Sequence, residues 1–152
     1  MSITRRKFIS LLTLSSTACL ALLNPVISWA AWASNAFNAN ELETALQNLY
    51  GSSSLIDSRK VTLILPKTAE NGAAVPISIK TTLEKVESIS IFVKDNPRPL
   101  TASFKIPEGT IAKVSTRIRL AQSSIITVVI KVGDKLYSQS QAINVTIGGC
   151  GN

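Results

Sequence analysis

Apolar and polar residues alternate over most of the chain after residue 60. An apolar side chain at every second position is typical of a strand with one buried face. The pattern predicts seven strands, in the ranges 61–65, 75–79, 89–93, 100–106, 114–120, 125–132 and 137–147. Gly133-Asp134 predicts a two-residue hairpin turn between the last two strands. Seven short strands with no helix between them predict a mainly β fold, an immunoglobulin-like antiparallel β-sandwich.

One short amphipathic helix is predicted ahead of the strands, from about Glu41 to Tyr50. Its apolar residues recur at helical spacing, at Leu42, Ala45, Leu46 and Leu49. Asn40 and Glu43 have the spacing of a capping box, and Gly51 stands where a helix commonly ends in the left-handed conformation. This helix and the sandwich together predict one folded domain over residues 34–147.

The first 33 residues have the composition of an export signal. Arg5, Arg6 and Lys7 precede an apolar run to Leu23, and small residues follow at 30–33. The adjacent arginines indicate the twin-arginine route and a periplasmic destination. Cleavage is expected after Ala33, with Ala30 as the alternative. The apolar run is short for a bilayer and carries Ser and Thr, so no stable membrane insertion is expected.

The composition excludes several kinds of chemistry. The chain has no histidine, so it forms no Ser-His or Cys-His pair and lacks the commonest metal ligand. Neither a metal site nor a cofactor is expected. The net charge of +7 falls to +4 without the leader, and the basic residues are spread along the sequence. No nucleic-acid binding is expected, because a nucleic-acid groove needs basic residues gathered on one face.

The last five residues, Gly148-Gly149-Cys150-Gly151-Asn152, form a separate segment after the final strand. Cys150 is the one cysteine left once the leader is removed, so it has no internal partner. Three residues beyond Ile147, its thiol extends at most about 10 Å from the strand end. Three interpretations stay open on the residues alone: an incidental terminus, a structural intermolecular disulfide, or a flexible arm that brings a thiol to another protein. Composition does not separate the last two.

Other polar groups have simpler explanations. Arg117 and Arg119 are predicted on the outward face of one strand, where they form a solvated surface or border a partner. Residues 122–124 are predicted to form a turn. Glu84 and Glu87 do not have the spacing of a catalytic carboxylate pair and are expected on the surface.

The chain resembles the SoxY family, the sulfur carriers of the periplasmic thiosulfate-oxidising Sox system. The specific match is the tail Val145-Thr146-Ile147-Gly148-Gly149-Cys150-Gly151, which is similar to the carboxy-terminal Gly-Gly-Cys-Gly-Gly arm of that family. Residues 115–122 and the loop Asn96-Pro97-Arg98-Pro99 also match. The final Asn152 departs from the family, in which the last residue is usually glycine.

The resemblance implies a covalent carrier that catalyses nothing itself. Cys150 would receive thiosulfate by oxidative conjugation at a haem-containing enzyme, and a hydrolase would release sulfate from the adduct. Gly148, Gly149 and Gly151 would let the arm extend and would keep it narrow, because glycine has no side chain. The chain would form a heterodimer with a SoxZ-like β-sandwich subunit. These expectations divide the chain into a twin-arginine signal peptide (1–33), a carrier domain (34–147) and an arm (148–152). The alternative is a secreted immunoglobulin-like interaction module with a structural intermolecular disulfide at Cys150.

Overall fold

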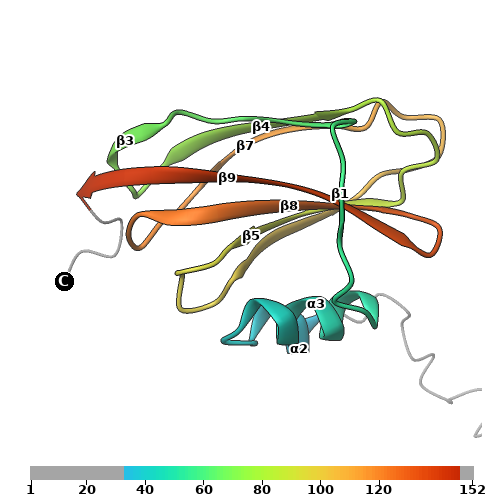
Figure 1. Cartoon of the computed structure of the whole chain (residues 1–152), viewed down its shortest axis with the longest axis horizontal. Helices are drawn as coiled ribbons and strands as arrows, with labels where there is room; N and C mark the ends of the chain where they lie inside the picture. The colour runs from blue at the N-terminus through green and yellow to red at the C-terminus, as the bar shows by residue number, and fades with distance from the viewer. Residues whose placement is uncertain (1–32, 148–152) are drawn as a thin grey trace, which may run out of the picture. The chain divides into compact units, whose positions relative to one another are not determined.

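The computed structural model describes residues 33–147, in which two helices precede nine strands (Figure 1). The helices are α2 (Ser34–Phe37) and α3 (Leu42–Tyr50). The strands are β1 (Ile56–Asp57), β2 (Val61–Ile64), β3 (Thr68–Asn71), β4 (Val75–Thr81), β5 (Ser88–Val93), β6 (Leu100–Lys105), β7 (Lys113–Ile118), β8 (Ser124–Val132) and β9 (Lys135–Ile147). No helix within this range is long and apolar enough to cross a membrane.

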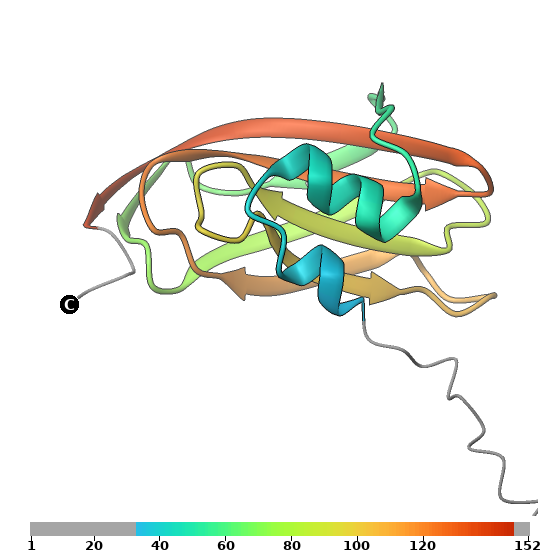
Figure 2. The same ribbon diagram turned by 90° about the horizontal axis from the view of Figure 1, so that it is seen from below.

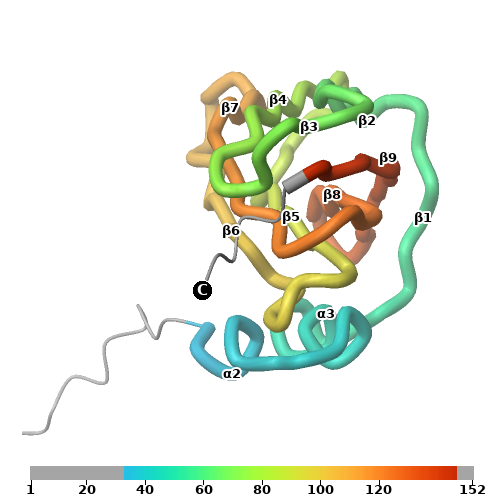
Figure 3. The backbone as a smooth tube through the Cα atoms, turned by 90° about the vertical axis from the view of Figure 1, so that its left-hand side faces the viewer, coloured from blue at the N-terminus to red at the C-terminus, as the bar shows by residue number. Residues whose placement is uncertain are grey.

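The strands form two sheets that pack as a β-sandwich of immunoglobulin-like type. The larger sheet has the order β1-β9-β8-β5-β6, and β3 also pairs with β9; the smaller sheet has the order β2-β4-β7. Both sheets therefore end on one side of the sandwich, in β6 and β7, while β1 lies on the opposite side (Figure 3). The predicted fold class is confirmed.

The core between the sheets is built by the alternation that predicted the strands. Along β7, Val114 and Ile118 are buried while Lys113, Ser115 and Arg117 are exposed. β8 contributes Ile126, Val128 and Ile130 to the same core, and β4 and β5 contribute further fully buried isoleucines. Burial of these aliphatic side chains supplies most of the driving force for folding.

A second apolar layer lies on the outer face of the larger sheet, where α2 and α3 cover it (Figure 2). It contains Ala36, Ala39, Ala45, Leu46, Phe92, Leu100, Val129 and Leu136. The Tyr50 hydroxyl donates to Ser90 Oγ at 2.7 Å, and Ser90 donates onward to Ser103 Oγ at 2.7 Å. This chain of hydroxyls connects the end of α3 to β5 and β6.

The predicted helix is present, and one detail of its start is wrong. Gly51 ends α3 in the left-handed conformation, with φ of 73°. At the other end the N-cap is Glu41 and no side chain caps the helix, so the capping box of Asn40 and Glu43 does not form. Glu43 accepts a hydrogen bond from Ser53 instead. The helix α2 was not predicted, because four residues are too few to show a helical period.

The strand count and the purely antiparallel pairing also need correction. Nine strands form, where seven were predicted, and β1 and β3 both pair parallel to β9. These two strands have only two and four residues, and β3 is mostly polar. Backbone pairing to β9 holds both strands in place. Such pairing does not depend on the side chains, so it produces no alternation of apolar and polar residues in the sequence.

The last two strands form the predicted hairpin. Val132 pairs with Lys135 across Gly133-Asp134, and Gly133 has a φ of 56°, which favours glycine. The Glu87 carboxylate accepts hydrogen bonds from the Lys131 ammonium and from the Gly133 N–H. The Lys131 contact is the main reason that the pKa of Glu87 lies below its ordinary value.

Candidate functional site

The candidate site begins at the end of β9. Cys150, Gly148, Gly149 and Gly151 lie outside the described residues. The structure does describe the segment to which they are attached, residues 144–147, which we call the arm root. β9 pairs with β8 as far as Ile143, so the arm root continues past the end of that pairing.

β3 holds the arm root on one side. Thr68 and Ala69 pair with Asn144 and Val145, and the pairing continues to Ile147. The Asn144 N–H donates to the Lys67 carbonyl at 3.0 Å. The Thr146 hydroxyl donates to the Glu70 carbonyl at 2.8 Å. Backbone pairing of the chain therefore persists to within three residues of Cys150.

Ser123 holds the arm root on the other side. Its Oγ accepts a hydrogen bond from the Val145 N–H at 2.8 Å and donates to the Val145 carbonyl at 3.4 Å. The bend at 121–123 confirms a turn near its predicted place, but Ser124 already begins β8. The role of Ser123 was missed, because its partner lies 22 residues away and nothing near it in the sequence indicates the contact.

The two segments that resemble SoxY away from the tail meet near the arm root. Asn96 accepts from the Ala121 N–H at 2.8 Å and donates from its amide nitrogen to the Arg119 carbonyl at 2.9 Å. In the same region the Leu120 N–H donates to the Gly72 carbonyl at 2.8 Å. The 95–99 loop therefore fixes the connection between β7 and β8, which carries Ser123 at its end.

Arg117 and Arg119 are both exposed, as predicted. Only Arg117 is part of β7, which ends at Ile118, and Arg119 follows in the connection to β8. Within residues 33–147, neither arginine has a carboxylate within salt-bridge distance. Both are therefore available to an anion or to an acidic surface.

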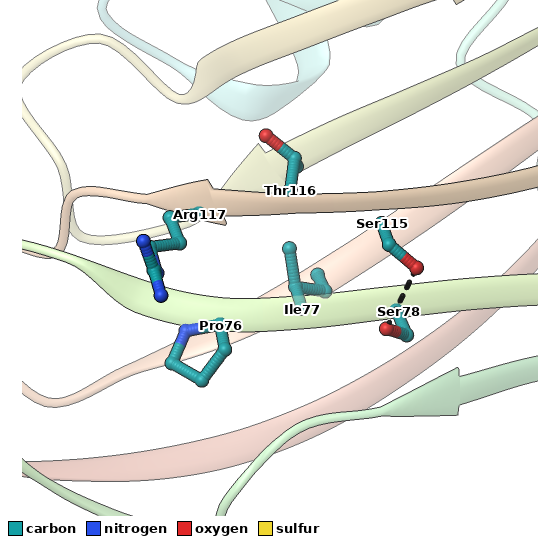
Figure 4. Close-up of a pocket in the computed structure, with 6 residues that line it drawn as sticks. All are labelled: Pro76, Ile77, Ser78, Ser115, Thr116 and Arg117. Carbon is teal, nitrogen blue, oxygen red and sulfur yellow. Dashed lines mark hydrogen bonds between the residues drawn. The ribbon is translucent and has the colours of Figure 1, made fainter.

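A shallow depression crosses the outer face of β4 and β7, and Figure 4 shows six of its residues. Pro76 faces Arg117 across the two strands, and Ser78 Oγ lies 2.9 Å from Ser115 Oγ. The two hydroxyls satisfy one another, and no acid or base that could activate them lines the depression. It has the features of a contact surface more than those of an active site.

Titratable groups with shifted pKa values lie away from the arm root. Burial raises the pKa of Tyr50 above its usual value, against the opposing effect of the Ser90 hydrogen bond. Tyr50 and Glu87 border the same hollow near the β8–β9 hairpin, toward the other end of the sandwich. No group of acidic or cysteine side chains among residues 33–147 could hold a metal ion.

The fold and the arm root define a class of protein: a β-sandwich whose last strand is clamped almost to its end and continues into a short cysteine-bearing tail. A family model described as "Sulfur oxidation protein SoxY" matches residues 46–150. The structure of the sulfur carrier protein SoxY from Chlorobium limicola f thiosulfatophilum superposes with a TM-score of 0.64 at 34% identity, covering 70% of this chain and 97% of that one. The chain belongs to the SoxY family.

The other comparisons add little to this assignment. A chain from a structural study of T cell specificity and activation by the bacterial superantigen toxic shock syndrome toxin-1 matches with a TM-score of 0.39 at 11% identity, covering 56% of this chain and 97% of that one. The comparison with curated proteins finds no match.

Proposed function

We propose that this chain is a periplasmic carrier that holds thiosulfate-derived sulfur covalently on Cys150 and presents it to partner enzymes. The observation that carries the proposal is the family match, which runs from α3 through the sandwich and ends at Cys150 itself. The similar protein from Chlorobium limicola is described as a sulfur carrier. The clamped arm root supports the same function, since a thiol delivered into another active site needs a firm base.

In the proposed cycle this chain supplies one thiol, and its partners supply the catalysis. Cys150 and thiosulfate would join through a new sulfur–sulfur bond, releasing one proton and giving two electrons to a haem-containing conjugating enzyme. Water would then cleave the terminal sulfur–sulfur bond at a hydrolase, releasing sulfate and leaving one additional sulfur on Cys150. The chain would itself remain non-catalytic, in line with the absence of histidine. Gly148, Gly149 and Gly151 would keep the arm narrow.

The proposal includes a folded heterodimer with a SoxZ-like β-sandwich subunit, exported together by the twin-arginine route. Residues 1–33 would be the leader, removed by cleavage after Ala33. Replacing Arg5 and Arg6 by lysine should keep the precursor in the cytoplasm. Fractionation and immunoblotting measure this, and periplasmic protein at the unmodified level would contradict the proposed route.

The main test is the intact mass of the exported chain isolated from thiosulfate-fed cells. We expect mass increases that match a thiosulfonate or an additional sulfur atom, and we expect Cys150→Ser to remove all of them. The melting temperature of Cys150→Ser should equal that of the unmodified chain, because the proposal gives the thiol a carrier role and no part in the fold. Ser53→Ala, in the segment after α3, leaves Cys150 in place and should keep the adducts.

Two outcomes would contradict the carrier proposal. A uniform reducible dimer with no sulfur adduct would favour the interaction module with a structural disulfide at Cys150. A Cys150→Ser variant that unfolds would show that the thiol is structural.

A further inference from the structure

The side of the sandwich formed by β6 and β7 has two neighbouring strand edges that are open. In the described part of the chain, β6 pairs only with β5 and β7 pairs only with β4. The other edge of the larger sheet differs, because β1 and β3 both pair there with β9. An open edge offers a row of unpaired N–H and C=O groups to another strand, and natural sheets usually protect such edges. Five of the six residues of β6 are uncharged, so the sequence does not protect it.

The net charge of the described residues is concentrated in the segment that forms this side. Residues 98–119 include five of the 13 basic residues, Arg98, Lys105, Lys113, Arg117 and Arg119, and one of the nine acidic residues, Glu108. All six are exposed. The remaining eight basic and eight acidic residues cancel, so this segment accounts for the whole net charge of +4. The basic residues are spread along the sequence, and the net charge gathers here because the segment has only one acidic residue.

The same side presents the most exposed large apolar side chain among residues 33–147. Ile111, between β6 and β7, is 88% exposed, whereas Ile56, Ile64 and Ile125 are 41–50% exposed. Its carbonyl accepts the Lys113 N–H at 2.8 Å, and the Thr110 N–H donates to the Pro107 carbonyl in the same loop. Ile111 is thus held outward by an ordered loop. Beside the open strand edges and the positive charge, Ile111 adds an apolar side chain that another protein could bury.

We infer that the β6–β7 side is the docking surface for the partner subunit of the proposed heterodimer, and that this partner presents an acidic β-strand edge. Its strand would continue the larger sheet beyond β6, its carboxylates would face Lys113 and Arg117, and an apolar pocket would receive Ile111. This inference rests on the proposed function for the existence of the partner. A second copy of this chain fits poorly, because it would bring two surfaces of the same positive sign together.

Docking on the β6 edge would not cover β9, the strand that leads to the arm. β9 is separated from β6 by two strands, β8 and β5. Ile111 lies in the connection at the opposite end of β7 from the 119–123 segment that contacts the arm root. The partner could therefore stay bound while Cys150 visits one enzyme after another.

The test uses the exported chain and its SoxZ-like subunit, with hydrogen exchange and binding kinetics as readouts. We expect the β6 amides to gain protection in the complex, while those of β2, the other edge of the smaller sheet, stay unchanged. Ile111→Ser should weaken the affinity about tenfold or more, whereas Ile64→Ser on β2 should change it less than about twofold. Lys113→Glu with Arg117→Glu should slow association, more strongly at low salt, and each single reversal should be compared with Lys60→Glu, a reversal away from this side.

Three outcomes would overturn the inference, and they differ in their consequences for the carrier proposal and for the heterodimer. A tight complex with unprotected β6 and a neutral Ile111→Ser would place the partner elsewhere, without affecting the carrier proposal. Self-association that Ile111→Ser abolishes, seen by sedimentation without the partner, would make a second copy the occupant. Binding to vesicles of anionic phospholipid that Lys113→Glu with Arg117→Glu removes, with no subunit complex, would make the surface a membrane contact and would overturn the heterodimer.

Discussion

The two apolar layers of this protein differ in composition and in the way they are held. The layer between the sheets is almost entirely aliphatic, and its large buried side chains come from six strands and neighbouring loops. The six strands are β2, β4, β5, β7, β8 and β9. The layer beneath α2 and α3 is smaller, includes three alanines, and depends in addition on the hydroxyl chain from Tyr50. The comparison indicates that the sandwich is the stable scaffold, and that the helices are a cover fixed partly by directional bonds.

The largest effect should come from the layer between the sheets. Ile91 is fully buried at the centre of β5, and Ile91→Ala leaves a cavity that its neighbours cannot fill. We expect a loss of about 3–4 kcal/mol in the free energy of unfolding, measured by urea denaturation. Ile111→Ala, at an exposed position, should change the unfolding free energy by less than about 0.5 kcal/mol. Equal losses would show that the described burial does not determine stability.

An intermediate effect is expected in the helical layer. Leu46 is 3% exposed between α3 and the sheet. Leu46→Ala should cost about 2–3 kcal/mol, at the lower end for leucine, because a two-helix cover can settle onto the sheet more readily than a sandwich core. In the Leu46→Ala variant, the backbone amides of α3 should exchange hydrogen faster than in the unmodified chain before those of β8 do. If β8 exchanges equally fast, the two layers unfold as one unit and the comparison fails.

The smallest effect is expected at the hydroxyl chain. Tyr50→Phe removes one partly buried hydrogen bond and should cost about 1 kcal/mol. Burial raises the pKa of Tyr50 in the folded state, so its contribution is complete below about pH 10 and is lost as the pH rises through the folded value. Denaturation at several pH values should therefore show a steeper alkaline loss of stability for the unmodified chain than for Tyr50→Phe. Identical pH profiles would argue against a buried hydroxyl.

Much of the sandwich could be predicted from the sequence, because a strand that buries every second side chain shows alternating apolar and polar residues. The alternation of Lys113, Val114, Ser115 and Thr116 predicts the two faces of β7, and Gly133-Asp134 predicts the hairpin. β1 and β3 could not be predicted, because backbone pairing with β9 determines them and their side chains have no repeating pattern. The helix α2 is shorter than the window that a helical period requires.

The candidate site was only partly visible in the sequence. The cysteine between glycines is a local signal, and it makes Cys150 the candidate without any knowledge of the fold; that assignment stays a prediction. The contacts of Ser123 and Thr146 at the arm root, and of Asn96 nearby, join segments 22 to 76 residues apart. A single sequence contains no record of such pairings, since serine, threonine and asparagine are equally common in ordinary turns.

The continuous pairing of β9 has a consequence for the geometry of delivery. Nine residue pairs with β8 fix its register, and a slip by one residue would turn every buried side chain to the wrong face. The register therefore fixes the position at which β9 ends, Ile147. The number of residues between this strand end and the thiol can change only by insertion or deletion in the tail. Under the proposed function, a fixed number of residues between this strand end and Cys150 would allow partner active sites to evolve to one depth.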